Sequence, residues 1–261
     1  MSGSEPVLLL DVGNTNIKVG LFAAGGIRES YVLPSSLSET ADTLGLKIVE
    51  ICRHERIEPH ELGGWMVSSV VPPLDSAVRR AGEKYSNCPV HFVPDDVALP
   101  LENAYDNPRE VGADRLVTAY AARELFLTPG ILVVDFGTAT TVECVQDRRY
   151  LGGLICPGML SSLQALGGQT SKLPRISLEL DSQEILIGRS TVTSMSQGFI
   201  YGFAAMIDGL CHRLRGTLRG QVTVVGTGGY ASKVQAVSTQ MQEVFPDLLL
   251  RGLAMACSLR T

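Results

Sequence analysis

The sequence carries one motif twice: a short apolar run, an aspartate, one further residue and a glycine. The first copy is Leu8-Leu-Leu-Asp-Val-Gly-Asn-Thr15, and the second is Leu132-Val-Val-Asp-Phe-Gly-Thr-Ala139. The two aspartates, Asp11 and Asp135, are separated by nearly half of the 261 residues. A repeat of this length predicts two domains of similar fold rather than one large domain.

The boundary between the predicted domains is expected near the helix over 113–127, where apolar and small residues recur at helical spacing. The domains then cover residues 1–117 and 118–261. Because no low-complexity linker separates the two halves, we expect them to pack against one another with a cleft between them.

Hydrophobic periodicity predicts strands and helices in both halves, and each Asp-Gly motif is expected to be a strand, a tight turn and a second strand. Strands are expected at 7–10, 17–22, 27–33, 64–71, 90–93, 131–134, 142–145 and 221–225, and helices at 38–55, 74–85, 113–127, 159–166 and 199–214. The glycine pairs at 25–26, 152–153 and 167–168 are interpreted as turns. Strands that alternate with helices indicate an α/β fold.

Composition argues against several other classes of protein. Hydrophobic residues make up 45% of the chain and charged residues 19%, which is typical of a globular domain. The net charge of -5 disfavours a nucleic-acid-binding surface. We find neither the apolar segment of a secretory signal nor an apolar run long enough for a membrane span. The six cysteines form no Cys-x-x-Cys pair, so we interpret them as free thiols in a reducing, cytoplasmic location.

The two Asp-Gly turns place chemically useful groups at the ends of apolar strands. Glycine lets the backbone approach a ligand closely, and successive N–H groups in such a turn attract an anion. Aspartate repels phosphate but holds a hydrated metal ion that neutralises it. Neutral donors follow in both turns: Asn14, Thr15, Thr138, Thr140 and Thr141. One such turn alone is most often an ordinary hairpin, but two matched copies favour a nucleoside triphosphate gripped between two domains.

Other nucleotide signatures are absent or incomplete. No G-x-x-x-x-G-K-[ST] P-loop occurs in the sequence. The segment Gly226-Thr-Gly-Gly-Tyr-Ala231 fits the dinucleotide pattern G-x-G-x-x-A, but too little chain follows it to complete such a domain. We therefore expect this third glycine cluster to pack against a base or a ribose.

The segment Gly112-Ala-Asp-Arg115 opens the predicted helix over 113–127. A carboxylate in a first helical turn is favoured by the helix dipole, so Asp114 is either a helix-start charge or a general base beside the phosphate site. Arg115 is interpreted equally as a ligand for a substrate carboxylate or as a partner in an ion pair. The four histidines show no metal-ligand spacing.

Three segments in this order resemble the type III pantothenate kinase family: Asp11-Val-Gly-Asn-Thr-Asn-Ile-Lys18, Asn107-Pro-Arg-Glu-Val-Gly-Ala-Asp-Arg115 and Asp135-Phe-Gly-Thr-Ala139. The later segments Gly152-Gly-Leu-Ile-Cys-Pro-Gly158, Gly188-Arg-Ser-Thr191 and Gly226-Thr-Gly-Gly229 fit the same pattern. That family belongs to the acetate and sugar kinase, Hsc70 and actin superfamily. The resemblance therefore implies two ribonuclease H-like (actin-like) domains, each a mixed sheet flanked by helices.

The resemblance also implies ATP-dependent phosphorylation of the primary hydroxyl of pantothenate, the first step of coenzyme A synthesis. It implies Mg²⁺ or another divalent cation, a monovalent cation (K⁺ or NH₄⁺), and a homodimer without nucleic acid or membrane partners. Asp114 would accept the proton, Asp135 would bind the monovalent cation, and Asp11 would organise the magnesium ion. The ATP-binding residues implied are Asp11, Val12, Gly13, Asn14, Thr15, Asn16, Ile17, Lys18 and Thr138. Those implied around pantothenate are Tyr105, Gly112, Ala113, Asp114, Arg115 and Thr191.

Two other classes of function stay open at this point. One is a kinase of the same superfamily that acts on a sugar or a short acid. The other is an accessory protein that uses this fold to sense a nucleotide, although the net charge of -5 weakens direct DNA binding. For Lys18, a place near the phosphates and a place on the strand surface are both open.

Overall fold

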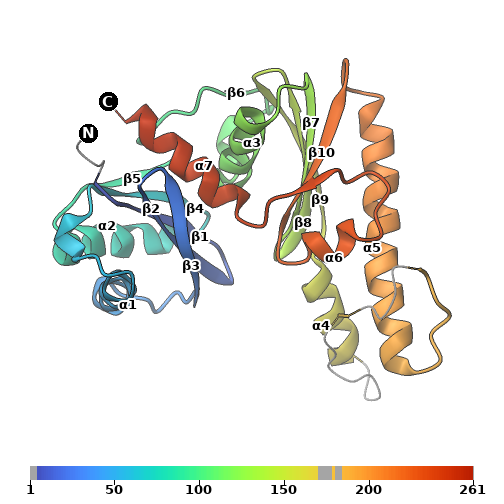
Figure 1. The fold of residues 1–261 in the computed structure, drawn as a ribbon, viewed down its shortest axis with the longest axis horizontal. Coiled ribbons are helices and arrows are strands. Elements are labelled where there is room, and N and C mark those ends of the chain that lie inside the picture. Colours follow the sequence, from blue (N-terminus) through green and yellow to red (C-terminus); the bar gives the residue numbers. More distant parts are fainter. Residues whose placement is uncertain (1–4, 170–177, 180–183, 261) are drawn as a thin grey trace. The chain divides into compact units, whose positions relative to one another are not determined.

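The computed structural model describes residues 5–169, 178–179 and 184–260 (Figure 1). The chain divides into two compact units. Unit 1 comprises the described residues of Met1–Leu101, Asp106–Ala121 and Leu248–Thr261, and unit 2 comprises those of Glu102–Tyr105 and Ala122–Asp247. These units differ from the predicted ranges 1–117 and 118–261, because the C-terminal segment belongs to unit 1 and residues 102–105 belong to unit 2.

Unit 1 is built on a five-stranded mixed sheet in the order β3-β2-β1-β4-β5. The strands are β1 (Val7–Val12), β2 (Asn16–Ala23), β3 (Gly26–Pro34), β4 (Gly64–Ser69) and β5 (Val90–Phe92). The helices are α1 (Ala41–His54), α2 (Pro72–Ser86), the first part of α3 (Ala113–Leu125) and α7 (Leu248–Ala256), with short 3₁₀ turns at Pro59–Glu61, Pro108–Glu110 and Cys257–Leu259. Strand β1 is antiparallel to β2 and parallel to β4.

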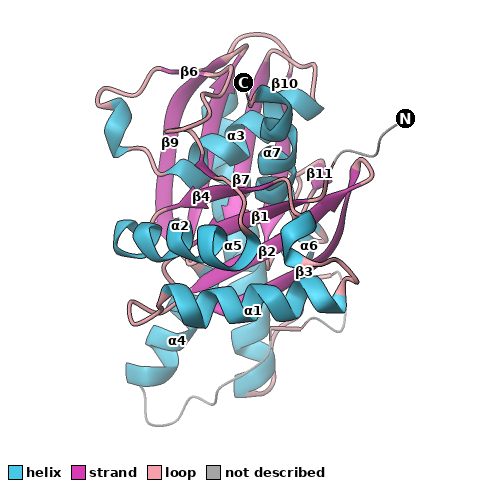
Figure 2. Cartoon of the chain, turned by 90° about the vertical axis from the view of Figure 1, so that its left-hand side faces the viewer, coloured by secondary structure: helices cyan, strands magenta, loops and turns pink. Residues whose placement is uncertain are grey.

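The central strand of unit 1 is buried on both faces, which explains its uninterrupted apolar run. Leu8 and Leu10 belong to the core shared with α1 and α2. Val7 and Leu9 belong to the core shared with α3 and α7. Figure 2 distinguishes these helices and strands by colour.

Unit 2 is built on a six-stranded sheet in the order β11-β10-β7-β8-β9-β6. The strands are β6 (Glu102–Asn103), β7 (Gly130–Phe136), β8 (Ala139–Gln146), β9 (Arg149–Pro157), β10 (Val222–Gly228) and β11 (Glu243–Val244). The helices that belong wholly to this unit are α4 (Met159–Gln169), α5 (Thr191–Arg215) and α6 (Ala231–Gln235). Over the described parts of the chain, we find no helix that is both long and apolar enough to cross a membrane.

The two sheets repeat one topology. In unit 2, β7 is antiparallel to β8 and parallel to β10, just as β1 is antiparallel to β2 and parallel to β4 in unit 1. Strands β1 to β5 therefore correspond to β7 to β11, and β6 is an addition at the edge of the second sheet. The prediction of two similar α/β domains, each a mixed sheet flanked by helices, is confirmed.

Several predicted elements are wrong in detail. Gly152 and Gly153 lie within strand β9, not in a turn, and Gly167 and Gly168 lie within helix α4. The exposed and less exposed positions of β9 alternate regularly, but the sequence hides this pattern, because apolar Leu151 and Ile155 occupy exposed positions and two glycines interrupt the run. A register shift also interrupts the pairing of β9 with β8. The sequence prediction also assigned nothing after residue 229, where the structure has α6, β11 and α7.

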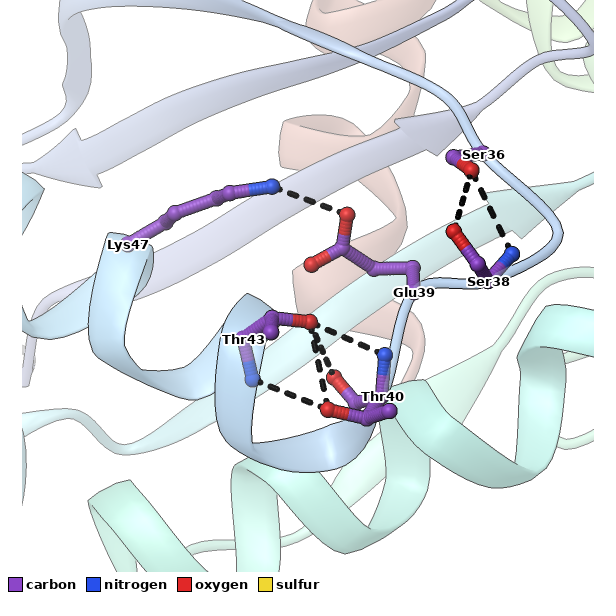
Figure 3. Close-up of polar contacts among 6 residues, drawn as sticks. All are labelled: Ser36, Ser38, Glu39, Thr40, Thr43 and Lys47. Carbon is purple, nitrogen blue, oxygen red and sulfur yellow. Dashed lines mark hydrogen bonds and ion pairs between the residues drawn. The ribbon is translucent and has the colours of Figure 1, made fainter.

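The loop that enters α1 is held by a dense set of polar contacts (Figure 3). Thr40 and Thr43 form a reciprocal capping box, which satisfies N–H groups at the start of the helix. Glu39 forms an ion pair with Lys47 at 2.8 Å. The backbone N–H of Ser35 donates to the carbonyl of Thr15 at 3.0 Å. This loop is therefore anchored to the first Asp-Gly turn at one end and to α1 at the other.

In unit 2, Asp208 of α5 ties the helix to the segment between α6 and β11. Its carboxylate accepts hydrogen bonds from the Ser238 hydroxyl at 2.6 Å, from both the N–H and the hydroxyl of Thr239 at 2.8 Å, and from the N–H of Gln240 at 3.2 Å. Burial raises the pKa of this carboxyl, but the hydrogen bonds from Ser238 and Thr239 outweigh it, and the net pKa lies below its ordinary value.

We expect Asp208→Asn to lower the free energy of unfolding by about 1–3 kcal/mol at pH 7, because a charged acceptor of several hydrogen bonds is lost. A carboxyl whose pKa is lowered by folding stabilises the protein above its unfolded pKa. The difference between the two proteins should therefore be complete above about pH 4 and should vanish as the pH falls through the lowered pKa of Asp208. Urea denaturation across this pH range measures it. Glu243→Gln, which removes an exposed carboxylate of the same unit, is the control, and equal losses in both variants would contradict the assignment.

Candidate active site

The first Asp-Gly turn follows the end of β1 and leads into β2. Asp11 is paired in register with Lys18, and the N–H of Gly13 donates to the carbonyl of Asn16 at 3.0 Å, which closes the turn. The exposed residues at the tip are Asn14, Thr15 and Asn16, whereas the side chains of Val12 and Ile17 are buried. Val12 and Ile17 thus offer a ligand only their backbone groups.

Asp11 is 8% exposed, and its carboxylate lies 3.8 Å from the ammonium group of Lys18. Carboxylate oxygens are the ligands that Mg²⁺ prefers. No group of three or more acidic, histidine or cysteine side chains suited to a metal occurs among the residues that the structure describes. A single carboxylate fits a magnesium ion that is bound mainly through substrate phosphates and water.

The second Asp-Gly turn has the same construction in unit 2. The N–H of Gly137 donates to the carbonyl of Ala139 at 3.1 Å, and Asp135 is paired in register with Thr141. Thr138 is exposed at the tip of the turn. Thr140 is fully buried, so its hydroxyl does not reach a ligand at the surface, contrary to what the sequence suggested.

The turn around Thr138 is braced by the start of α4. Ser161 donates its hydroxyl to the carbonyl of Thr138 at 2.9 Å. A Cβ atom on Gly158 would lie 1.9 Å from the same carbonyl oxygen, so only glycine permits this approach. The role of Gly158 in holding Thr138 appears only in the tertiary structure.

The third glycine cluster lies beside Asp135. Strand β10 is parallel to β7, and Thr227 is in register with Asp135. Gly228 has a φ of +88°, and a Cβ atom there would lie 2.5 Å from Oδ1 of Asp135 and 2.7 Å from the carbonyl oxygen of Phe136. The Asp135 carboxylate and the Phe136 carbonyl therefore both lie against Gly228, where only glycine leaves room for their oxygens.

Asp114 lies in the first turn of α3 in unit 1, where it is partly buried. Its Oδ1 accepts a hydrogen bond from the N–H of Arg115 at 2.7 Å. A Cβ atom on Gly112 would lie 2.5 Å from the same oxygen, so the glycine makes room for the carboxylate. The helix N-terminus favours the negative charge of this group.

Within unit 1, Val70 connects the first turn to Asp114. Its N–H donates to the carbonyl of Val12 at 3.0 Å, and its side chain lies 3.2 Å from the Cβ position of Gly112. Nearby, the hydroxyl of Ser69 donates to Asp75 at 2.6 Å. Burial raises the pKa of Asp75, against the lowering effect of the Ser69 hydrogen bond. The structure thus brings the Asp11 turn and the Asp114 segment to the same part of unit 1.

The two remaining predicted substrate residues, Tyr105 and Thr191, lie in unit 2. Tyr105 follows β6 and is partly buried. Thr191 is the first residue of α5, directly after the capping residue Ser190. It lines a cavity of about 880 Å³ whose other walls come from the same helix, from Gly188 and Arg189, and from Leu166.

The fold first defines a class: two units of similar, actin-like fold, which is also the fold of sugar kinases of known structure. The structure is similar to the inorganic polyphosphate/ATP-glucomannokinase from Arthrobacter sp. strain KM, with a TM-score of 0.52 over 99% of this chain and 100% of that one. The sequence identity is 13%, so this likeness shows the fold alone. The fold class predicted from the sequence is confirmed.

Sequence comparison then identifies the family. Residues 7–213 match the family described as type III pantothenate kinase. The chain is 52% identical over 253 residues to the type III pantothenate kinase of Nitratidesulfovibrio vulgaris strain Miyazaki F, covering 97% of both sequences. It is 48% identical to that of Oleidesulfovibrio alaskensis, covering 94% of both. The chain belongs to the type III pantothenate kinase family.

Proposed function

We propose that this chain transfers the γ-phosphoryl group of ATP to the primary hydroxyl of pantothenate, which yields 4'-phosphopantothenate and begins coenzyme A synthesis. The observation that carries the proposal is the family match over most of the chain, with relatives named type III pantothenate kinase. The two matched Asp-Gly turns agree with it, since phosphoryl transfer needs charge neutralisation and placement more than covalent chemistry. No comparable observation favours a sugar kinase or a nucleotide sensor.

In unit 1, the turn from Asp11 to Lys18 binds the phosphates of ATP. Its backbone N–H groups and the exposed Asn14, Thr15 and Asn16 side chains donate hydrogen bonds to phosphate oxygens. Asp11 holds the divalent cation, which neutralises charge on the phosphates when bound. Lys18, 3.8 Å from Asp11, adds a positive charge beside that carboxylate.

Asp114 is the proposed general base. A carboxylate within hydrogen-bond reach takes the proton of the attacking hydroxyl as the phosphoryl group is transferred. Gly112 supports this role, because it leaves space for Oδ1 of Asp114. Arg115, next in the chain, is assigned to the carboxylate of pantothenate, where a guanidinium group forms paired hydrogen bonds. Gly112 and Ala113 complete this side of the pantothenate site.

In unit 2, Thr138 is assigned to ATP, and Tyr105 and Thr191 to pantothenate. Asp135 is assigned to a monovalent cation, K⁺ or NH₄⁺. Asp135 and the neighbouring Phe136 carbonyl, whose oxygens both lie against Gly228, offer oxygen ligands of the kind that such a cation prefers. The cation supplies positive charge near the phosphates in a chain with few lysines in its phosphate turns.

We also propose that the protein is a cytoplasmic homodimer without nucleic acid or membrane partners, and that α5 supplies the dimer contact. Large apolar residues are exposed at the start of this helix and in the preceding segment: Ile185, Leu186, Ile187 and Val192. Phe199 and Phe203 stack at 6.2 Å on the same helix. An added Cβ atom on Gly198 or Gly202 would meet no other atom within 4 Å. An apolar surface of this kind is typical of an interface, and a second copy of the chain is the proposed occupant.

The unaltered protein is expected to phosphorylate pantothenate, but not sugars or acetate, in a coupled assay with ATP, magnesium and potassium. Asp114→Asn should lower kcat by about 10²–10⁴-fold, because the general base is lost while the ATP contacts stay. Glu83→Gln, an exposed carboxylate on α2, is the control and should have normal kcat.

Near-normal turnover by Asp114→Asn would remove this residue from the base role while leaving the substrate assignment intact. Phosphorylation of a sugar alone would instead support another kinase of this fold, and a lack of any kinase activity would overturn the proposed function.

The monovalent cation is tested by substitution. Replacing potassium with sodium or with a bulky organic cation should lower kcat by at least about 10-fold, since an ion of the wrong size does not fit fixed oxygen ligands. Ammonium should restore activity. Full activity in every salt at equal ionic strength would contradict the assignment of Asp135.

The dimer is tested by sedimentation at micromolar concentration. The unaltered protein should sediment with twice the 28.0 kDa chain mass. Gly202→Arg should sediment as a folded monomer, because the exposed position tolerates a side chain but a close interface does not. Leu127→Arg, at an apolar position that is 97% exposed, is the control and should stay dimeric. A monomeric unaltered protein would refute the proposal.

A further inference from the structure

Tyr105 is held by the edge strand that distinguishes the second sheet from the first. Strand β6 pairs with β9, with Asn103 in register with Tyr150. The N–H of Ala104 donates to the carbonyl of Tyr150 at 2.9 Å, and the N–H of Tyr105 donates to the side chain of Asn103 at 3.1 Å. The backbone on the N-terminal side of Tyr105 is thus fixed to β9.

The ring of Tyr105 also lies against β9. A Cβ atom on Gly152 would lie 3.0 and 3.1 Å from two ring carbons of Tyr105. Gly152 has a φ of +106°, a conformation that favours glycine independently of the space available. The ring centroids of Tyr105 and Tyr150 are 6.5 Å apart, with 33° between the ring planes. The ring of Tyr105 thus packs beside Gly152 and Tyr150 of strand β9.

Tyr150 is itself fixed by a buried carboxyl group. Its ring is completely buried, and its hydroxyl donates to Oε2 of Glu143 at 2.7 Å. Glu143, on the neighbouring strand β8, is 1% exposed. A Cβ atom on Gly153 would lie 2.9 Å from the same Oε2, so this glycine leaves space for the carboxyl group.

A buried polar pair of this kind stabilises a fold little more than an apolar pair of the same shape, but it restricts the side chains to one arrangement. Neither Glu143 nor Tyr150 is exposed enough to touch a substrate. Tyr150 lies beside the ring of Tyr105, which is only partly buried.

We propose that Glu143 and Tyr150 are positioning residues that hold the Tyr105 ring in place for recognition of the acceptor substrate. This inference rests on the proposed function, in which Tyr105 contacts pantothenate. It adds two buried residues to the recognition of the acceptor. It also gives the two glycines of β9 different roles, because Gly152 leaves space for the Tyr105 ring and Gly153 leaves space for the Glu143 carboxyl group.

Tyr150→Phe removes only the hydroxyl and keeps the ring beneath Tyr105. The KM for pantothenate should rise at least about fivefold, while kcat and the KM for ATP stay within about twofold, because the change loosens a group that binds substrate and transition state alike. Glu143→Gln keeps an oxygen that accepts the Tyr150 hydroxyl, so its KM for pantothenate should stay near normal.

Tyr31→Phe is the matched control, because Tyr31 in unit 1 donates its hydroxyl to Glu55 at 2.5 Å in the same kind of tyrosine–glutamate bond. This variant should change neither KM. The thermal midpoint of each variant shows whether it is folded. Glu143→Leu, which removes the acceptor of the Tyr150 hydroxyl, should raise the KM for pantothenate in the same way and provides the test if Tyr150→Phe does not fold.

A double-mutant cycle separates positioning from general damage. In the Tyr105→Ala background, Tyr150→Phe should have no further effect on the KM for pantothenate, because the ring that Tyr150 positions has been removed. An unchanged KM for pantothenate in folded Tyr150→Phe, an equal rise in both KM values, or full additivity with Tyr105→Ala would each overturn the inference. These outcomes presuppose an active unaltered enzyme, whereas an unaltered protein without pantothenate kinase activity overturns the proposed function and this inference together.

Discussion

The burial of the two central strands on both faces is the constraint on which the rest of the structure depends. Strands β1 and β7 each have an antiparallel neighbour on one side and a parallel neighbour on the other. The antiparallel neighbour follows directly in the chain, so a tight turn must stand at the end of each central strand. Asp11 and Asp135 occupy these two ends, where the apolar run stops and polar groups become accessible. The same strand arrangement in both units thus produces two equivalent polar turns.

Glycine then decides how closely other segments approach these turns. Gly158 allows contact with the carbonyl of Thr138, Gly228 allows contact with Asp135, and Gly112 leaves space for Asp114. In each case a Cβ atom would lie 2.5 Å or less from an oxygen, closer than atoms approach without a bond. Several of the 27 glycines of this chain therefore serve the packing around candidate ligand groups rather than surface turns.

Each unit carries some of the polar groups that are assigned to the proposed reaction. Asp11 and Asp114 belong to unit 1, where Val70 connects their segments, and Asp135, Thr138, Tyr105 and Thr191 belong to unit 2. The proposed general base, Asp114, therefore belongs to unit 1, and the proposed ligand of the monovalent cation, Asp135, belongs to unit 2. The relatives that carry the family name support the proposed overall chemistry.

The sequence by itself determined the repeat, the two-unit α/β fold, the polar turns at Asp11 and Asp135, and the resemblance to type III pantothenate kinases. These features depend on local patterns, namely an apolar run, a turn residue and a motif of fixed spacing. Only the tertiary structure decided that β9 is a strand, that α7 returns to unit 1, and that Gly228 lies beside Asp135. It alone also showed that buried Glu143 and Tyr150 support Tyr105. These features depend on strand pairing and on burial. Both bring together residues that are distant in the sequence, so no local sequence pattern predicts which residues become neighbours.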